Sequence, residues 1–148
     1  MQRLLFLCTA NYYRSRFAEI FFNWHAAQRS LPWKAESRGM IVDPGNPGMM
    51  FHETRARLGT HGIPLTEYER LPLAVTTEDL AAAQHVIAVK RTEHHPAMQR
   101  RFPDWVEKVE FWEVHDIDCS LPRDSLPHLE KEVLALIERL AAKQQTNG

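Results

Sequence analysis

The stretch LLFLCTANYYRSRFAEIFF, residues 4–22, begins with the pattern of a buried strand and ends with that of a helix. We expect a strand at residues 3–8, because residues 4–8 are apolar without alternation, which is typical of a strand covered on both faces. From Ser15 onward, apolar residues recur about one helical turn apart, at Phe17, Phe21 and Trp24. A short turn therefore joins the strand to the helix, and Cys8 and Arg14 lie on that turn.

The rest of the chain repeats this alternation. We expect further strands at residues 34–39, 85–89 and 109–114, and helices at 49–60, from Thr76 or Thr77, and at 92–101. A last helix carries Leu129, Val133, Leu136, Ile137 and Leu140 on one face. The pattern predicts an α/β fold, a three-layer α/β/α arrangement around a central four-stranded parallel sheet.

Length and charge limit the classes of partner. The 148 residues suit one domain spanning 1–148, with a frayed tail from about residue 143. The net charge of −1 gives no general attraction for nucleic acid or an anionic membrane, so neither is expected as a partner. The apolar run at residues 4–8 is far shorter than the roughly 20 residues that span a bilayer. We expect a cytoplasmic protein that is a monomer or a weak dimer.

The two cysteines, Cys8 and Cys119, cannot form a disulfide framework, although a single bridge between them is left open. In a reducing compartment both are free thiols. The eight histidines contain no pair at one-turn helical spacing, so we expect surface histidines and no metal site.

The turn between the first strand and the first helix has the parts of an anion site. Unpaired backbone N–H groups and a helix N-terminus attract negative charge, and together with Arg14 they stabilise a thiolate at Cys8. The same donors can bind the non-bridging oxygens of a phosphoryl group, and the planar fork of Arg14 can hold two of them. Ser15 can donate to the sulfur, and Asn11 tolerates left-handed backbone. We therefore predict a phosphate-binding loop with Cys8 as a nucleophile.

Each of these residues also has an ordinary structural explanation. Cys8 could be a small buried hydrophobe that ends a strand, Ser15 a helix N-cap, and Arg14 a solvated residue of the first turn. Their occurrence together on one strand-to-helix turn favours the anion site.

The segment FLCTANYYRSRFAE, residues 6–19, resembles the signature of the low-molecular-weight protein tyrosine phosphatase family, C-x-x-N-x-C-R-S followed by a short segment ending in Ala-Glu. The match covers Cys8, Asn11, Arg14, Ser15, Ala18 and Glu19. Weaker similarities at residues 36–39, 58–65 and 76–89 extend the resemblance to about residue 140. The family also contains thiol-dependent arsenate reductases of the same fold.

The resemblance implies a cofactor-free and metal-free phosphomonoester hydrolase that acts on a phosphorylated substrate such as a phosphotyrosine protein, through a cysteinyl-phosphate intermediate. The implied phosphate-binding residues are Thr9, Ala10, Asn11, Tyr12, Tyr13, Arg14 and Ser15. The family also has a late aspartic acid, usually before proline, that protonates the leaving oxygen and later activates water. In FWEVHDIDCSLP, residues 111–122, Asp116 is the better match and Asp118 the second candidate.

Two departures from the family pattern leave alternatives open. Tyr13 replaces the family's second cysteine, and bulky Tyr12 and Tyr13 either reshape the rim of the pocket or obstruct it. A chain without Asp-Pro could be an impaired module that only binds phosphate or phosphoprotein. An arsenate reductase would use Cys119 as a resolving thiol, although that branch uses two further thiols.

Overall fold

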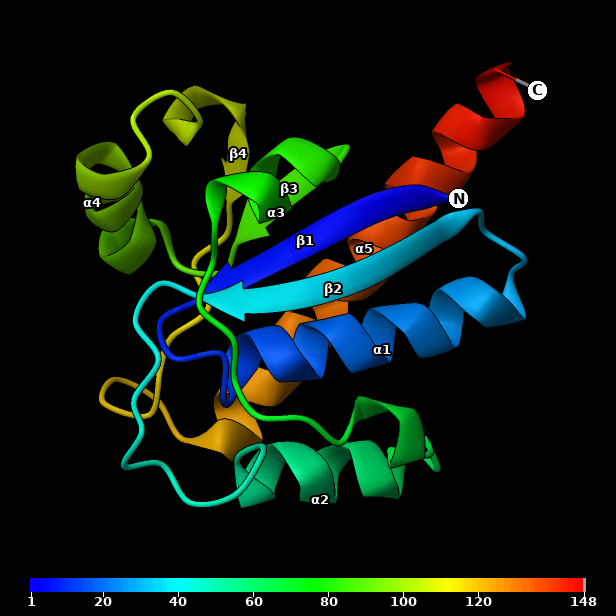
Figure 1. Ribbon diagram of the computed structural model, residues 1–148. Coiled ribbons are helices and arrows are strands. Elements are labelled where there is room, and N and C mark those ends of the chain that lie inside the picture. The colour runs from blue at the N-terminus through cyan, green and yellow to red at the C-terminus, as the bar shows by residue number, and fades with distance from the viewer. Residues whose placement is uncertain (148) are drawn as a thin grey trace.

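Four parallel strands form the central sheet of the computed structural model, which describes residues 1–147, with side chains described through residue 145 (Figure 1). The strands are β1 (Gln2–Cys8), β2 (Trp33–Gly39), β3 (His85–Ala88) and β4 (Val109–Phe111), in the spatial order β2-β1-β3-β4. The predicted α/β class and the four-stranded parallel sheet are confirmed.

Helices cover both faces of this sheet (Figure 1). One face carries α1 (Arg14–Gln28), α2 (His52–Thr60) and α5 (Pro122–Asn147), and the other carries α3 (Thr77–Ala82) and α4 (Arg91–Arg101). Two 3₁₀ turns, η1 (Thr66–Tyr68) and η2 (Val106–Lys108), lie in the connections. None of the helices within residues 1–147 combines the length and apolar character needed to cross a membrane.

The lack of alternation in β1 follows from this layering. Leu4 and Phe6 enter the core with α1 and α5, whereas Leu5 and Leu7 enter the core with α3 and α4. Because successive strand residues point to opposite faces, a strand at the centre of three layers needs apolar residues at every position. Cys8 ends this strand at the carboxyl edge of the sheet, where the connecting loops gather (Figure 1).

Several element boundaries differ from the predictions by one residue, and three differ in ways that have a structural reason. β4 ends at Phe111 rather than at residue 114, although Val114 N still donates to Val89 O over 2.7 Å. Helix α2 begins at His52 rather than at residue 49, because the N–H of Phe51 donates to Tyr12 O instead of to a helical carbonyl. Helix α5 begins at Pro122, before its apolar stripe, and runs to Asn147 through most of the segment expected to fray; residue 148 lies outside the described residues.

Gly39 sits opposite Cys8 in the register of β1 and β2, directly against the turn that follows β1. A Cβ atom at this position would lie 2.8 Å from Ala10 C and Asn11 N and 2.9 Å from Thr9 O. These are backbone atoms, which cannot swing aside as the end of a flexible side chain can. Glycine at this position therefore lets the turn pack on the end of β2.

Replacing Gly39 by alanine is expected to destabilise the protein by about 1–3 kcal/mol, because the added methyl group overpacks the turn. Gly59 is the matched control, since a Cβ atom there meets nothing within 4 Å and the residue lies in α2. Gly59→Ala should stabilise the protein by about 0.5–1 kcal/mol through helix propensity. Denaturant unfolding of both variants measures the difference, and equal effects would refute the close approach.

Candidate active site

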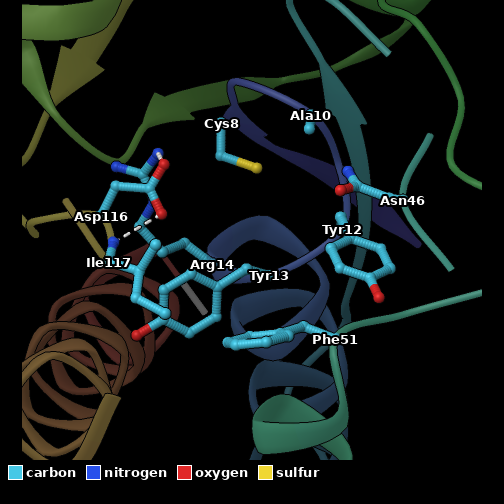
Figure 2. Close-up of a pocket in the computed structure, with 9 residues that line it drawn as sticks. All are labelled: Cys8, Ala10, Tyr12, Tyr13, Arg14, Asn46, Phe51, Asp116 and Ile117. Carbon is cyan, nitrogen blue, oxygen red and sulfur yellow. Dashed lines mark hydrogen bonds and ion pairs between the residues drawn. The ribbon is translucent and has the colours of Figure 1, made fainter. Parts of the chain in front are cut away.

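One cavity of about 230 Å³ lies at the carboxyl edge of the sheet (Figure 2). Its walls come from the turn after β1, the loop before α2 and the loop after β4. The lining residues are Cys8, Ala10, Tyr12, Tyr13, Arg14, Asn46, Phe51, Asp116 and Ile117. Figure 2 shows the Cys8 sulfur between Asp116 on one side and Tyr12 on the other. The structure thus brings Cys8, Arg14 and Asp116 together, although Asp116 is distant in sequence.

The turn itself leaves a run of backbone donors unused. Within residues 1–147, none of the backbone N–H groups of residues 9–15 donates a hydrogen bond to the protein. Asn11 adopts a φ of 54°, in the left-handed region that asparagine tolerates better than most residues. Unpaired N–H groups next to a helix N-terminus form a site for an anion.

The Cys8 sulfur shares a hydrogen bond with Ser15 at the end of a chain that begins at Asn11. Asn11 Nδ2 donates to Ser15 Oγ over 2.8 Å, and Ser15 Oγ lies 2.8 Å from Cys8 Sγ. The serine hydroxyl accepts from Asn11 and still has its own hydrogen, which it can donate to the sulfur. All three residues are buried, so this hydrogen-bonded chain is shielded from solvent.

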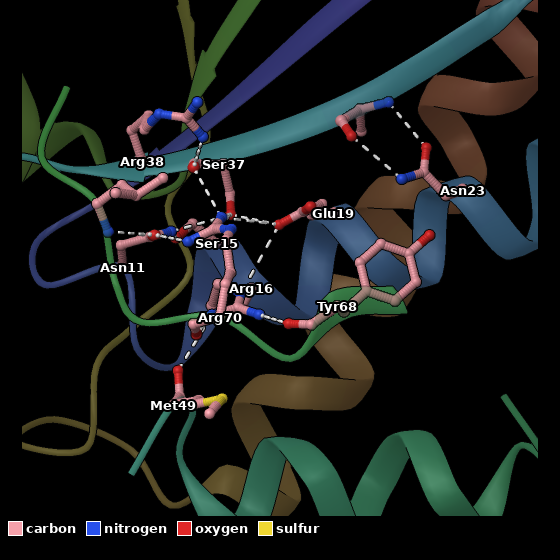
Figure 3. Close-up of polar contacts among 12 residues, drawn as sticks. Asn11, Ser15, Arg16, Glu19, Asn23, Ser37, Arg38, Met49, Tyr68 and Arg70 are labelled. Carbon is pink, nitrogen blue, oxygen red and sulfur yellow. Dashed lines mark hydrogen bonds and ion pairs between the residues drawn. The ribbon is translucent and has the colours of Figure 1, made fainter. Parts of the chain in front are cut away.

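Asn11 is itself held by partners from two other segments (Figure 3). Its Oδ1 accepts from Arg70 and from the N–H of Leu73, which fixes Nδ2 as the donor toward Ser15. Nδ2 also donates to Ser37 Oγ on β2, over 2.9 Å. Hydrogen bonds to β2 and to the segment that carries Arg70 therefore fix the left-handed conformation at Asn11.

Arg16 ties the surrounding loops to α1. This side chain is fully buried, and it donates to the carbonyl groups of Met49, Tyr68 and Arg70 (Figure 3). Burial lowers the pKa of Arg16 to about 10, which still leaves it charged at neutral pH. Its contacts join the loop before α2 to the segment that carries Arg70.

The Arg14 guanidinium is buried and presents one edge without hydrogen bonds. Nη1 donates to Glu93 Oε2 and to Val114 O, and Nη2 donates to Glu93 Oε1. Each terminal nitrogen carries two hydrogens, and a carboxylate that binds both nitrogens takes the inner pair, which lies between Nη1 and Nη2. The outer Nη2 hydrogen and Nε–H remain, and Nε has no partner among the described residues. These two donors point the same way and match two phosphoryl oxygens.

Asp116 lies beside this open edge. Its Oδ2 is 3.2 Å from Arg14 Nη2, and its Oδ1 accepts from the N–H of Ile117 over 2.8 Å. Asp118, two residues further on, is exposed and does not line the cavity. Burial alone would lower the pKa of Arg14, but the negative charges of Cys8, Asp116 and Glu93 outweigh burial and raise it.

The two tyrosines form walls of the cavity and leave it open. The Tyr12 hydroxyl donates to Pro47 O over 2.6 Å, which turns the ring against Phe51, with 5.9 Å between ring centroids. The Tyr13 ring meets Phe51 edge-on at 5.2 Å, and burial raises the Tyr13 pKa to about 12. Both rings therefore form walls of the pocket that contains Cys8, and they reshape it rather than obstruct it.

Several residues of the site were missed in the sequence. Glu93 and Arg70 come from segments that carry no motif of their own, and only tertiary contacts reveal them. The expectation of surface histidines is wrong for His94, which is 1% exposed and contacts Thr9. Met49 and Met50 do not line the cavity, whereas Phe51 does. Cys8 and Cys119 are both free thiols, and Cys119 does not line the cavity.

Comparisons with known proteins agree with this geometry. The family model described as low molecular weight phosphotyrosine protein phosphatase matches residues 3–146. Nothing matched in a search of curated proteins.

Solved structures show the same fold. The low molecular weight protein tyrosine phosphatase from T. tengcongensis is 25% identical with a TM-score of 0.77, covering 97% of this chain and 99% of that one. The YwlE arginine phosphatase from Geobacillus stearothermophilus is 24% identical with a TM-score of 0.73, covering 99% and 95%. A thioredoxin-dependent arsenate reductase from Corynebacterium glutamicum is 14% identical with a TM-score of 0.71, covering 97% and 63%. Because the family model spans nearly the whole chain, this protein belongs to the low molecular weight phosphotyrosine protein phosphatase family and is a phosphatase.

Proposed function

We propose that this protein hydrolyses phosphomonoesters through a cysteinyl-phosphate intermediate, with Cys8 as nucleophile and Asp116 as general acid and then general base. The observation that carries the proposal is the convergence of Cys8, the open edge of Arg14 and Asp116 on one cavity. These three groups have complementary roles in phosphoryl transfer, as nucleophile, phosphoryl-binding cation and general acid.

In the first step, the Cys8 thiolate attacks phosphorus as the ester P–O bond breaks. The leaving oxygen takes its proton from Asp116. Nε–H and the outer Nη2–H of Arg14 hold two non-bridging oxygens, and the free N–H groups of residues 9–15 hold the phosphoryl group in the turn. Asp116 leaves its ion pair with Arg14 when the phosphoryl group takes the same edge.

In the second step, water attacks the phosphorus of the cysteinyl phosphate and the P–S bond breaks. The Asp116 carboxylate accepts the proton of that water, and inorganic phosphate and the Cys8 thiolate are released. No metal ion or cofactor takes part in either step.

Phosphotyrosine is the substrate class that the cavity walls favour. The rings of Tyr12 and Phe51 and the side chain of Ile117 offer apolar surface on which an aromatic leaving group can pack. Phosphoarginine is the second candidate, since a relative is named an arginine phosphatase and the Asp116 carboxylate could face a guanidinium. An arsenate reductase has less support, because Cys119 lies outside the cavity.

Hydrolysis of p-nitrophenyl phosphate in excess EDTA tests the reaction, and matched phosphotyrosine and phosphoarginine peptides test the substrate. The proposal is supported if hydrolysis continues in excess EDTA and kcat/KM is higher for the phosphotyrosine peptide than for the phosphoarginine peptide. A higher kcat/KM for the phosphoarginine peptide would retain the cysteinyl-phosphate mechanism but change the proposed substrate class to phosphoarginine. Phosphate binding without turnover of any substrate would favour a binding module.

Replacing Asp116 by asparagine is expected to lower kcat by about 10²- to 10⁴-fold, because the amide cannot protonate the leaving oxygen. Asp118→Asn is the matched control and should leave kcat within about twofold, since Asp118 is exposed and away from the cavity. Steady-state kinetics of the two variants decide between the residues. A larger loss in Asp118→Asn would transfer the acid role to that residue.

A further inference from the structure

Glu93 occupies an unusual position behind the cavity. It lies in the first turn of α4, yet its two oxygens reach the two terminal nitrogens of Arg14, each over 3.2 Å. It does not line the cavity, and its side chain is 28% exposed. Glu93 therefore holds Arg14 along the edge formed by Nη1 and Nη2, and the adjacent edge formed by Nε and Nη2 remains open.

The same carboxylate also reaches the turn after β1. Thr9 Oγ1 donates to Glu93 Oε1, and it lies 3.1 Å from His94 Nε2. His94 Nδ1 accepts from the N–H of Lys90 over 3.1 Å, so the ring proton lies on Nε2 and points to Thr9. His94 is almost fully buried, which fixes this arrangement at the start of α4.

Glu93 remains a carboxylate throughout the range in which a phosphatase is assayed. Burial alone would raise its pKa, but contact with His94 and the positive charge of Arg14 outweigh burial and lower the pKa to about 2. A permanently charged partner keeps both terminal nitrogens of Arg14 engaged, and rotation of the guanidinium would break two charge-assisted hydrogen bonds together.

We propose that Glu93 is a positioning residue of this site, which holds Arg14 and Thr9 from α4 so that Nε–H and the outer Nη2–H of Arg14 face the phosphoryl group. The proposal rests on the proposed function for the identity of the bound anion. Glu93 touches neither substrate nor reacting atoms and acts through Arg14. It adds to the site a residue from an element outside the phosphate-binding loop.

Three substitutions separate position from charge. Glu93→Asp keeps the charge but withdraws the carboxylate by one methylene group, Glu93→Gln keeps the length but removes the charge, and Glu93→Ala removes both. Glu107→Gln is the control, since Glu107 is exposed in η2 and makes no side-chain bond within the described chain. Circular dichroism and thermal unfolding report whether each variant is folded.

Calorimetric titration with inorganic phosphate at fixed ionic strength is the first measurement. We expect Glu93→Ala and Glu93→Asp to weaken phosphate binding by about tenfold or more, because the Arg14 fork is no longer aligned. Glu93→Gln should stay within about threefold of wild type, since relief of charge repulsion offsets one lost hydrogen bond. Phosphate binding by Glu93→Ala or Glu93→Asp as tight as that of wild type, or tighter, would overturn the proposal.

A double-mutant cycle on kcat/KM then tests whether Glu93 acts through Arg14. The loss caused by Glu93→Ala, of about 10- to 100-fold, should shrink to less than about threefold in an Arg14→Lys background. An equal loss in both backgrounds would show a general structural role and refute positioning. The phosphate titration requires no turnover, so failure of the proposed reaction and failure of the Glu93 proposal give different results.

Discussion

Replacement of Cys8 by serine is expected to abolish turnover, with kcat lower by a factor on the order of 10⁴ or more, and to leave the protein folded. The serine hydroxyl is a far weaker nucleophile, because it is not ionised at neutral pH. Serine is close to cysteine in size, so the buried end of β1 and the contact with Ser15 should be kept. Steady-state kinetics with p-nitrophenyl phosphate and a thermal unfolding curve measure the two effects.

The control for this variant is Cys119→Ser, which should retain full activity because Cys119 lies outside the cavity. If Cys8→Ser kept more than about 1% of wild-type kcat, the nucleophile would have to be another group. Loss of activity in Cys119→Ser would instead give this second thiol a part in hydrolysis that the proposed mechanism does not include.

Replacement of Arg14 by lysine is expected to lower kcat/KM by about 10³-fold and to weaken phosphate binding. Lysine keeps the positive charge beside Glu93 and Asp116, but its ammonium group lacks the planar fork that presents Nε–H and Nη2–H side by side while Nη1 donates to Val114 O. The charge is retained, so the variant should still fold.

Arg100→Lys is the matched control for that substitution. Arg100 is exposed near the end of α4 and makes no side-chain bond within the described residues, so its kinetics should equal those of wild type. A loss of less than about threefold in Arg14→Lys would mean that only charge, and not the planar fork, matters at this position.

The sheet and the turn after β1 could be predicted because their signals are local. An unbroken apolar run, a change of period and a Cys-to-Arg spacing all fall within residues 4–22. Asp116 was found through the resemblance to the family's late aspartic acid, and it lies at the same sheet edge as Cys8 because it follows β4 and parallel strands end at one edge. The end of β4 was predicted too late because apolar residues continue past Phe111, where the chain leaves the ladder and passes the start of α4.

The residues that orient the turn could not be predicted in this way. Arg70 lies 59 residues from Asn11, and Glu93 lies 79 residues from Arg14. Neither has a periodic or motif signal, because their partners lie far away in the sequence: Arg70 contacts Asn11, Glu19 and Ser37, and Glu93 contacts Thr9 and Arg14. His94 was expected at the surface because no two histidines have one-turn helical spacing, yet the first turn of α4 directs it inward against Thr9.

The central claim is that Cys8 carries the phosphoryl group during turnover, and trapping of that intermediate tests it most directly. Wild-type protein should be mixed with phosphotyrosine peptide, quenched within one turnover, and its peptides examined by mass spectrometry. We predict a phosphoryl group on the peptide that contains Cys8, absent in Cys8→Ser. Turnover at the normal rate with no phosphorylated Cys8 at any quench time would contradict the account.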